Sequence, residues 1–233
     1  WFENVSIVLY EALRWYDFTR ASATAQFWRP EYVASRARSF LNPARKTWND
    51  LEEGNIPQGI KRVTAYLGAL RDTANAVAVF SGAPLAERRL LMELPARAAA
   101  AGLSGLFADF VSLFTSSEVS DENFTAWVSS YVGIFEALKQ STTAPVSLSP
   151  YRRGYYEKAL NALYPHSPAA AVWLMVYTWT KAAAALPRTE QPYKDWQELC
   201  RQLDLESRDL PTRLELFDAV LDTVEEAVDH LSA

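Results

Sequence analysis

The sequence has little of several residues on which catalysis and metal binding commonly depend. It contains one cysteine, Cys200, and two histidines, His166 and His230, among 233 residues. A single cysteine excludes an intramolecular disulfide and a site built from several thiolates, and two histidines leave little for zinc or for a Ser-His-Asp triad. Glycine is also scarce, with 8 residues, and we expect glycine and proline to mark the ends of helices.

Charge and hydropathy exclude further classes of protein. The net charge is −5 and the isoelectric point is near 5.2, which argues against a general nucleic-acid binder. Apolar residues make up 49% of the chain and aromatic residues 13%, enough for a packed core. The most apolar run, residues 168–186, is interrupted by two threonines and Lys181, so it predicts a buried helix and not a membrane span. We expect no membrane partner and a cytoplasmic location.

Apolar residues recur at helical spacing along almost the whole chain. The repeat begins near Val5 and resumes after Pro30 and Pro57, and no alternating run is long enough for a sheet. We therefore predict an all-α fold, an irregular multi-helix bundle of roughly eight to ten helices with no sheet. Pro84 predicts the start of one of these helices, and Pro95 predicts its break.

One segment has the composition of a linker. Residues 141–150 consist of Ser, Thr, Pro and a few small or apolar residues, and they carry no charge. We predict a helical bundle over residues 1–140, a linker over 141–150, and C-terminal helices over 151–233 that pack on the first bundle.

The last predicted helix has the most regular pattern. Its apolar residues alternate spacings of four and three, and they are Leu210, Leu214, Phe217, Leu221, Val224, Val228 and Leu231. Such a stripe allows a coiled-coil partner and therefore a homodimer. The favoured interpretation is one helix of an antiparallel bundle, because the pattern covers only about three heptads.

Charged residues are unevenly distributed along the chain. Between Arg14 and Arg62 there are nine basic and five acidic residues, whereas Glu190 to His230 contains four basic and twelve acidic ones. The two regions either attract each other in the fold, or the basic region faces an anionic ligand. Ordinary solvated helix faces are the simpler interpretation.

The common catalytic motifs are missing. There is no P-loop, no G-x-G-x-x-G, no Glu-x-x-His pair and no Gly-x-Ser-x-Gly elbow. Neighbouring carboxylates such as Glu52 and Glu53 point about 100° apart on a helix, so they form no metal site by themselves. We predict no catalytic residue and no metal ligand in this chain.

The most suggestive polar residues lie around the corner between two predicted helices. Asn75 falls within an apolar helix, where a buried amide needs a hydrogen-bond partner. Arg88 and Arg89 fall in the first turns of the next helix, where arginine opposes the helix dipole. Their guanidinium groups are suited to pair with Glu93 or to bind an anion. A polar corner that joins two helices is the simpler interpretation.

Several segments carry a family resemblance. They are Glu53-Gly-Asn55, Tyr66, Arg71, Ala74-Asn-Ala76, Ser81-Gly-Ala-Pro-Leu-Ala-Glu-Arg-Arg89, Ala171-Val-Trp173, Tyr177-Thr-Trp179, Trp196, Leu199-Cys200 and Arg213 through Glu226. Over most of the chain, and loosely, they resemble the helical region that follows the catalytic head in bacterial nucleotidyltransferases of the kanamycin-nucleotidyltransferase type. In that family the head resembles a polymerase-β palm with a Gly-Ser motif and an Asp-x-Asp metal pair, and neither occurs here.

The resemblance implies a helical substrate-positioning domain that is not catalytic by itself. It implies a small-molecule acceptor or a nucleotide as the ligand. The candidate ligand-binding residues are Tyr66, Arg71, Asn75, Arg88 and Arg89. No cofactor is expected in this chain, because Mg and a nucleotide would belong to a catalytic head that the resemblance places upstream of Trp1.

Two other functions are open at this point. The stripe of the last helix favours a protein-interaction or dimerisation module. Trp173, Tyr177 and Trp179 favour a small-molecule binding protein with an aromatic pocket, although aromatic residues at helical spacing usually pack inside.

Overall fold

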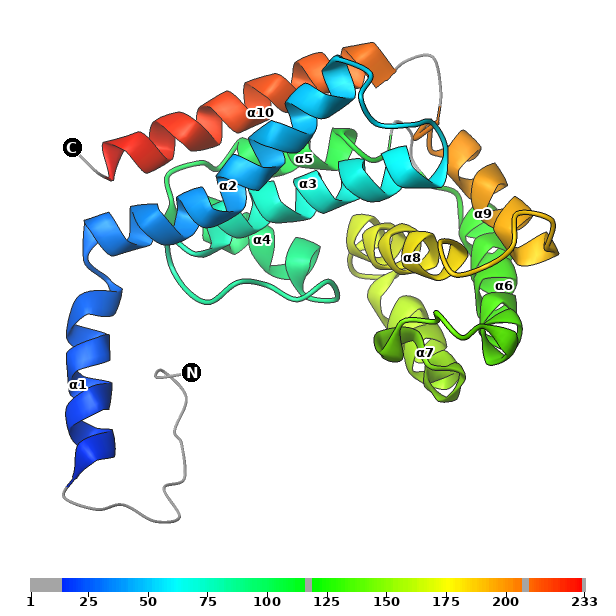
Figure 1. Cartoon of the computed structure of the whole chain (residues 1–233), viewed down its shortest axis with the longest axis horizontal. Coiled ribbons are helices and arrows are strands. Elements are labelled where there is room, and N and C mark those ends of the chain that lie inside the picture. The colour runs from blue at the N-terminus through cyan, green and yellow to red at the C-terminus, as the bar shows by residue number, and fades with distance from the viewer. Residues whose placement is uncertain (1–13, 116–118, 207–209, 232–233) are drawn as a thin grey trace.

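The fold is entirely helical where it is described. The structure is a computed structural model that describes residues 14–115, 119–206 and 210–231 (Figure 1). These residues form ten α-helices and three short 3₁₀ helices and contain no strand, so the predicted all-α bundle is confirmed. The helical repeat predicted near Val5 lies outside the described residues.

The helices follow the chain in a regular order. The α-helices are α1 Trp15–Phe27, α2 Pro30–Glu52, α3 Ile60–Ala78, α4 Leu90–Ala100, α5 Leu106–Ser112, α6 Asp121–Ala137, α7 Arg153–Leu163, α8 Pro168–Ala183, α9 Gln191–Gln202 and α10 Leu210–His230. The 3₁₀ helices are η1 Leu138–Gln140, η2 Val146–Leu148 and η3 Pro150–Arg152.

Several helices begin at or beside a proline, and one begins after a capping serine. Pro30, Pro168 and Pro192 occupy the first turns of α2, α8 and α9, where an N–H would have no intrahelical acceptor. Ser120 caps α6, and its Oγ accepts a hydrogen bond from the backbone N–H of Asn123 at 3.2 Å. These starts follow from the sequence because each depends on a local backbone requirement.

The predictions for Pro84 and Pro95 are wrong. Residues 79–89 form bends and turns, and α4 begins only at Leu90, because the backbone of Leu85 is bonded to Asn75 of α3 instead of to a helical neighbour. Pro95 lies within α4 without ending it. Its ring removes one backbone hydrogen bond, but α4 retains a buried apolar face that packs on the bundle.

Helices α8 and α3 lie at the centre of the bundle. Almost every residue of α8 is buried, and this helix packs against α3, α4, α6, α7 and α9. Helix α3 in turn packs against α2, α4 and α10. The largest fully buried side chains include Trp173, Trp179 and Trp196, and one continuous apolar core links both halves of the chain.

Opposite charges join the two ends of the chain. Arg45 of α2 forms ion pairs with Asp218, Asp222 and Glu225 of α10, including contacts of 2.8 and 2.9 Å to Glu225. Arg38 of α2 bonds Asp229 at 2.9 Å. The basic and acidic regions of the sequence therefore attract each other within the fold, which is one of the two outcomes that their charge predicts.

The apolar stripe of α10 is buried by the same chain. Its members from Leu210 to Val228 are buried, and Leu231 packs partly against the core. Helix α10 lies along α2, with further contacts to α3 and α5 (Figure 1). The bundle interpretation of this pattern is therefore the one that the fold adopts.

The predicted linker is partly structured and attached to the core. Residues 141–150 contain η2, whose Leu148 is buried. Ser141 Oγ donates to the carbonyl oxygen of Ala185 at 2.9 Å. On either side of this segment, α6 packs against α7, α8 and α9, so helices before and after it share one core. The division at 141–150 stays a prediction.

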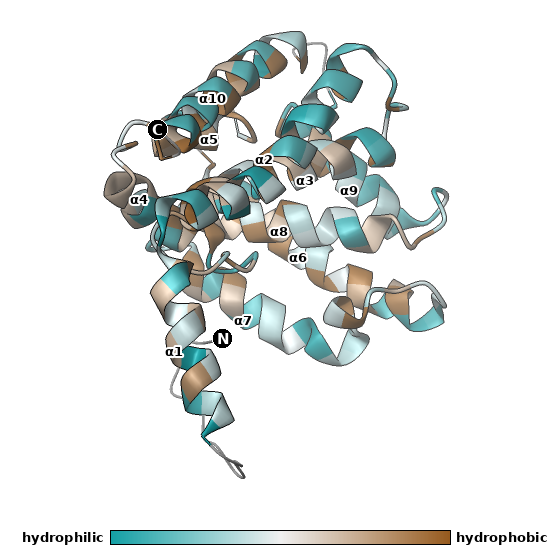
Figure 2. Ribbon diagram, turned by 60° about the vertical axis from the view of Figure 1, so that its left-hand side comes forward, coloured by the Kyte–Doolittle hydropathy of each residue, from teal (hydrophilic) through white to brown (hydrophobic). Residues whose placement is uncertain are grey.

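Helix α1 is the least covered element. It extends away from the other helices, contacts mainly α2 and contains no buried residue (Figure 1). The hydropathy colouring of Figure 2 shows both hydrophobic and hydrophilic positions along α1. Trp15 is 64% exposed and Phe18 is 68% exposed. Among the helices of the described residues, none is both long enough and apolar enough to cross a bilayer.

Candidate functional site

The five predicted ligand-binding residues lie in three different environments. Tyr66 and Asn75 of α3 are buried in the core. Arg71, also on α3, is half-buried at the edge of the bundle. Arg88 and Arg89 are exposed, and they precede α4 where the sequence predicts that they lie within a helix. The structure therefore does not gather all five around one cavity.

Tyr66 has a structural environment. Its hydroxyl donates to the carbonyl oxygen of Leu113 at 2.7 Å, and the same oxygen accepts from Nη1 of the buried Arg213 at 3.2 Å. Its ring packs edge-on against Phe217 with centroids 5.9 Å apart. Burial raises the pKa of Tyr66 although the charge of Arg213 lowers it. The side chain thus joins α3 to α5 and α10 and has no exposed polar atom for a ligand.

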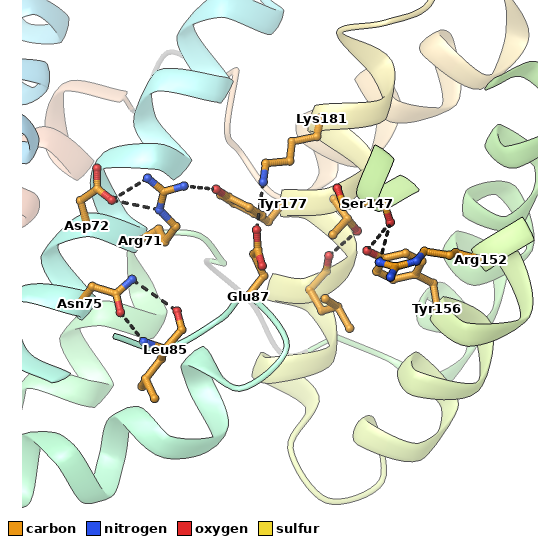
Figure 3. Close-up of polar contacts among 12 residues, drawn as sticks. Arg71, Asp72, Asn75, Leu85, Glu87, Ser147, Arg152, Tyr156, Tyr177 and Lys181 are labelled. Carbon is orange, nitrogen blue, oxygen red and sulfur yellow. Dashed lines mark hydrogen bonds and ion pairs between the residues drawn. The ribbon is translucent and has the colours of Figure 1, made fainter. Parts of the chain in front are cut away.

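Asn75 holds the loop between α3 and α4. The backbone N–H of Leu85 donates to Asn75 Oδ1 at 2.6 Å, and Asn75 Nδ2 donates to the Leu85 carbonyl oxygen at 3.4 Å (Figure 3). Gly82 of the same loop lies against the guanidinium of Arg97, where a Cβ atom would overlap Nη1. The buried amide therefore has the partner that the sequence analysis required, and it positions residues 81–89 without facing solvent.

Arg71 belongs to a cluster of four charged side chains and one tyrosine, the Arg71–Lys181 cluster, formed by Arg71, Asp72, Glu87, Tyr177 and Lys181. Arg71 Nε and Nη2 donate to Asp72 Oδ1 at 2.9 and 2.7 Å, and its Nη1 donates to the Tyr177 hydroxyl at 2.7 Å. Lys181 Nζ donates to Glu87 Oε1 at 2.9 Å and lies 4.5 Å from the centroid of the Tyr177 ring. Figure 3 shows α3, α8 and the loop before α4 meeting at these side chains.

Glu87 and Lys181 of this cluster hold each other in the ionised form. Burial alone would raise the pKa of Glu87, but the hydrogen bond from Lys181 and further contacts lower it on balance. Burial alone would lower the pKa of Lys181, but its hydrogen bond to Glu87 and the nearby Tyr177 raise it. Glu87 and Lys181 therefore stay charged, and Arg71 links α3 to α8 through its hydrogen bond to the Tyr177 hydroxyl.

An exposed face lies beside the cluster. We call it the Arg88–Tyr155 face after the two residues that form it, and the exposed Tyr151 and Arg152 lie a few positions before Tyr155 in the chain. Arg88 Nη1 donates to the Tyr155 hydroxyl at 3.3 Å, and the guanidinium carbon lies 5.4 Å from the ring centroid. Tyr155 is 49% exposed and Tyr151 is 99% exposed. Arg89 faces elsewhere, because it pairs with Glu93 one turn along α4, as the sequence analysis allowed.

The connection between this face and the cluster runs through Tyr156. Its hydroxyl donates to the Ser147 carbonyl oxygen at 3.0 Å (Figure 3). Its ring packs edge-on against that of Tyr155. Burial raises the pKa of Tyr156, and the charge of Glu87 adds to this shift while Arg152 opposes it. Sequence reasoning missed Tyr155, Glu87 and Lys181, because each meets its partner only through a contact between segments far apart in the chain. It also missed Arg152, whose contact with the Ser147 carbonyl oxygen is local.

The three residues of the predicted aromatic pocket are core residues. Trp173 packs against Phe110, Phe114 and Tyr177, and Trp179 Nε1 donates to the carbonyl oxygen of Pro192 at 3.3 Å. Of these three residues, only Tyr177 contacts the Arg71–Lys181 cluster, through its hydroxyl. The core interpretation of this aromatic pattern is the one that the fold adopts.

The remaining reactive residue types are not gathered into a site. Cys200 is buried, and burial raises its pKa well above the ordinary value, which disfavours the nucleophilic thiolate. Within residues 14–115, 119–206 and 210–231, no three His, Cys, Asp or Glu side chains are placed to hold a metal ion.

Comparison of the chain with protein-family models, with curated proteins and with solved structures gives no significant match. The resemblance to the helical region of nucleotidyltransferases therefore stays a prediction. The fold defines the chain as an all-α bundle.

Proposed function

We propose that this chain is a helical substrate-positioning domain of a nucleotidyltransferase-like protein, not catalytic by itself, that holds a nucleotide or a small acceptor at the Arg88–Tyr155 face. The observation that supports it best is an exposed arginine, Arg88, whose guanidinium group lies over the ring of the half-exposed Tyr155 and donates to its hydroxyl. Aromatic rings stack on bases, and guanidinium groups bind phosphate through several N–H donors.

The structure gives this face a rigid support. Asn75 holds the backbone of the loop that carries Arg88, and the Lys181–Glu87 ion pair ties the same loop to α8. On the other side, Tyr156 anchors the start of α7 below Tyr155. Rigid support matters because a preformed site does not have to order its side chains when a ligand binds. In this proposal Asn75 and Arg71 act as positioning residues, and Arg88 and Tyr155 contact the ligand.

Isothermal titration calorimetry with ATP as the nucleotide probe tests the proposal. The double variant Arg88→Ala, Tyr155→Leu should weaken ATP binding about tenfold or more, because it removes both the charge-assisted contact and the ring face. Arg188→Ala is the matched control, since Arg188 is an exposed arginine beyond the end of α8. Equal binding of ATP by the protein and the double variant, or no heat of binding to either, would overturn the proposal.

A second function is favoured by one specific observation. Helix α1 exposes Trp15 and Phe18, and Trp28 and Tyr32 near the α1–α2 junction are also exposed. Large aromatic residues that gather on an uncovered helix favour an interface, here a homodimer. This observation replaces the stripe of α10, which is covered by the chain itself. Light scattering on the protein and on Trp15→Ala, Phe18→Ala tests it, because a monomer in both cases would contradict dimerisation.

A further inference from the structure

A cavity of about 900 Å³ lies at the start of α3, away from the Arg71–Lys181 cluster. It is bounded by the last turns of α2, the loop before α3, the first turn of α3, Glu206 after the end of α9, and the first turns of α10. In Figure 1 this is the region where the end of α2 lies beside the start of α10. Its volume is in the range of about 300–1,000 Å³ that small-molecule sites occupy.

Apolar side chains form a large part of its wall. They are Trp48, Leu51, Ile56, Leu210, Pro211 and Leu214. The indole of Trp48 is held in place, because its Nε1 donates to the carbonyl oxygen of Leu214 at 2.8 Å. Trp48 thus ties α2 to α10 and presents a fixed aromatic wall, which suits the apolar body of a ligand.

The charged groups of the wall are mostly acidic. Four carboxylates, those of Glu52, Glu206, Glu215 and Asp218, stand against the single guanidinium of Arg62. Asp218 is already paired with Arg45. The other three carboxylates have no ion-pair partner within 4 Å in the part of the chain that the structure describes. The cavity therefore combines an apolar wall with an excess of negative charge.

Glu206 is the carboxylate with the clearest need for a partner. It is half-buried, and its Oε1 lies 3.7 Å from the position that a Cβ atom on Gly59 would occupy. Burial raises its pKa above the ordinary value even though Arg62 lowers it. A cation that entered the cavity would interact favourably with this poorly solvated charge, whereas an anion would add repulsion.

We propose that this cavity binds a small organic cation, a molecule that carries one ammonium group on an aromatic or branched aliphatic body. The body lies against Trp48 and Leu214, and the ammonium group lies near Glu206 and Glu215. Charge complementarity selects this class, because the three carboxylates without an ion-pair partner outnumber the single guanidinium of Arg62, which disfavours an anion and leaves a neutral molecule without a charged partner. The site shares no residue with the Arg88–Tyr155 face, so either proposal can fail without the other.

Three probes of the same shape test the charge requirement directly. They are 2-phenylethylamine as the cation, 2-phenylethanol as the neutral molecule and phenylacetate as the anion, each titrated at pH 7 into the full chain. The readout is the indole N–H resonance of Trp48 in a nitrogen–proton NMR spectrum, assigned with Trp48→Phe. We expect the amine to shift this resonance at millimolar concentration, the alcohol to bind about tenfold more weakly, and phenylacetate to leave it unchanged.

The variants separate the cavity from general surface charge. Glu206→Gln, Glu215→Gln keeps the size of the cavity and should weaken amine binding about tenfold or more. Glu122→Gln is the matched control, because Glu122 is exposed at the start of α6. Equal binding of the three probes by the unchanged protein would overturn the proposal. So would an equal loss of amine binding in the control and the double variant, or no shift of Trp48 with the amine.

Discussion

At the scale of single residues, Asn75 has the greatest influence on the candidate site. Its amide bonds both backbone polar groups of Leu85, ten residues away, and both side chain and loop backbone are buried. A buried donor or acceptor left without its partner costs about 1–3 kcal/mol. The loop that carries Glu87 and Arg88 therefore depends on one side chain of α3.

We expect Asn75→Ala to lower the free energy of unfolding by about 1–3 kcal/mol, because the N–H and carbonyl groups of Leu85 lose their partner. Urea unfolding followed by circular dichroism measures the change. Asn49→Ala, at an exposed position of α2, should stay within about 0.5 kcal/mol of the unchanged protein. Equal stabilities of the two variants would show that the Leu85 contact does not hold the loop.

The half-buried position of Glu206 should make the stability of the fold depend on pH. Burial raises its pKa in the folded state, with Arg62 as the charged group that opposes the shift. A carboxyl group with a raised folded pKa stabilises the fold while it is protonated, and this contribution is lost as the pH rises through that pKa. Glu206→Gln should therefore raise the melting temperature at pH 7 and have little effect at pH 4. A gain at pH 4 that is equal to the gain at pH 7 would contradict this assignment.

The sequence identified some of these residues and missed others for a physical reason. Asn75 stands out because a buried amide within an apolar helix requires a hydrogen-bond partner. Arg88 stands out because arginine in the first turns of a predicted helix opposes the helix dipole. Tyr155, Glu87 and Lys181 do not stand out locally. Lys181 meets Glu87 across 94 positions of sequence and Arg88 meets Tyr155 across 67, so these contacts depend on how α7 and α8 pack.

At the scale of elements, Arg45 connects the two longest helices of the described chain. Its guanidinium bonds three carboxylates spaced along one face of α10, and the Arg45 side chain is only 22% exposed. The hydrogen bond to Glu225 is the main cause that raises the pKa of Arg45, so the group stays charged at any accessible pH. Without Arg45 the three carboxylates would repel one another on α10.

Arg45→Met should lower the free energy of unfolding by about 1–3 kcal/mol, since a hydrogen-bonded charge network at a half-buried position is stronger than a surface pair. Sodium chloride should lower the stability of the unchanged protein more than that of the variant, because salt screens the ion pairs of Arg45. Thermal unfolding at low and high salt measures both effects. Arg38→Met is the control, because the exposed Arg38–Asp229 pair contributes less than about 1 kcal/mol. A smaller effect of Arg45→Met than of the control would contradict this account.

The helix starts are predictable from the sequence where only local backbone requirements determine them. The helix starts at Pro30 and Pro168 are predictable, because proline lacks a backbone N–H and the first turn of a helix offers no intrahelical acceptor for one. The start predicted at Pro84 is wrong because Asn75 binds the backbone of Leu85, a tertiary contact that overrides the local signal. The apolar stripe of α10 is correctly predicted. The helices that cover it, α2, α3 and α5, are determined by the packing of the whole bundle.

At the scale of the whole molecule, one core joins helices from both sides of residues 141–150. The all-α class is predictable because apolar residues at helical spacing leave no alternating run for a sheet. The arrangement of the helices is not predictable in this way, since it depends on which apolar faces meet. The proposed ligand site depends on this arrangement, because the packing brings Arg88 of one segment against Tyr155 of another.

The most direct test of the central proposal is a residue-resolved NMR titration of the full chain with ATP. The account predicts that backbone amide resonances of residues 86–89 and 151–156 shift together and saturate with one affinity. The resonances around the α2–α10 cavity, residues 54–62 and 210–215, should stay in place, because that cavity is acidic. Shifts confined to the cavity, or no saturable shift in residues 86–89 and 151–156, would contradict a nucleotide site at the Arg88–Tyr155 face.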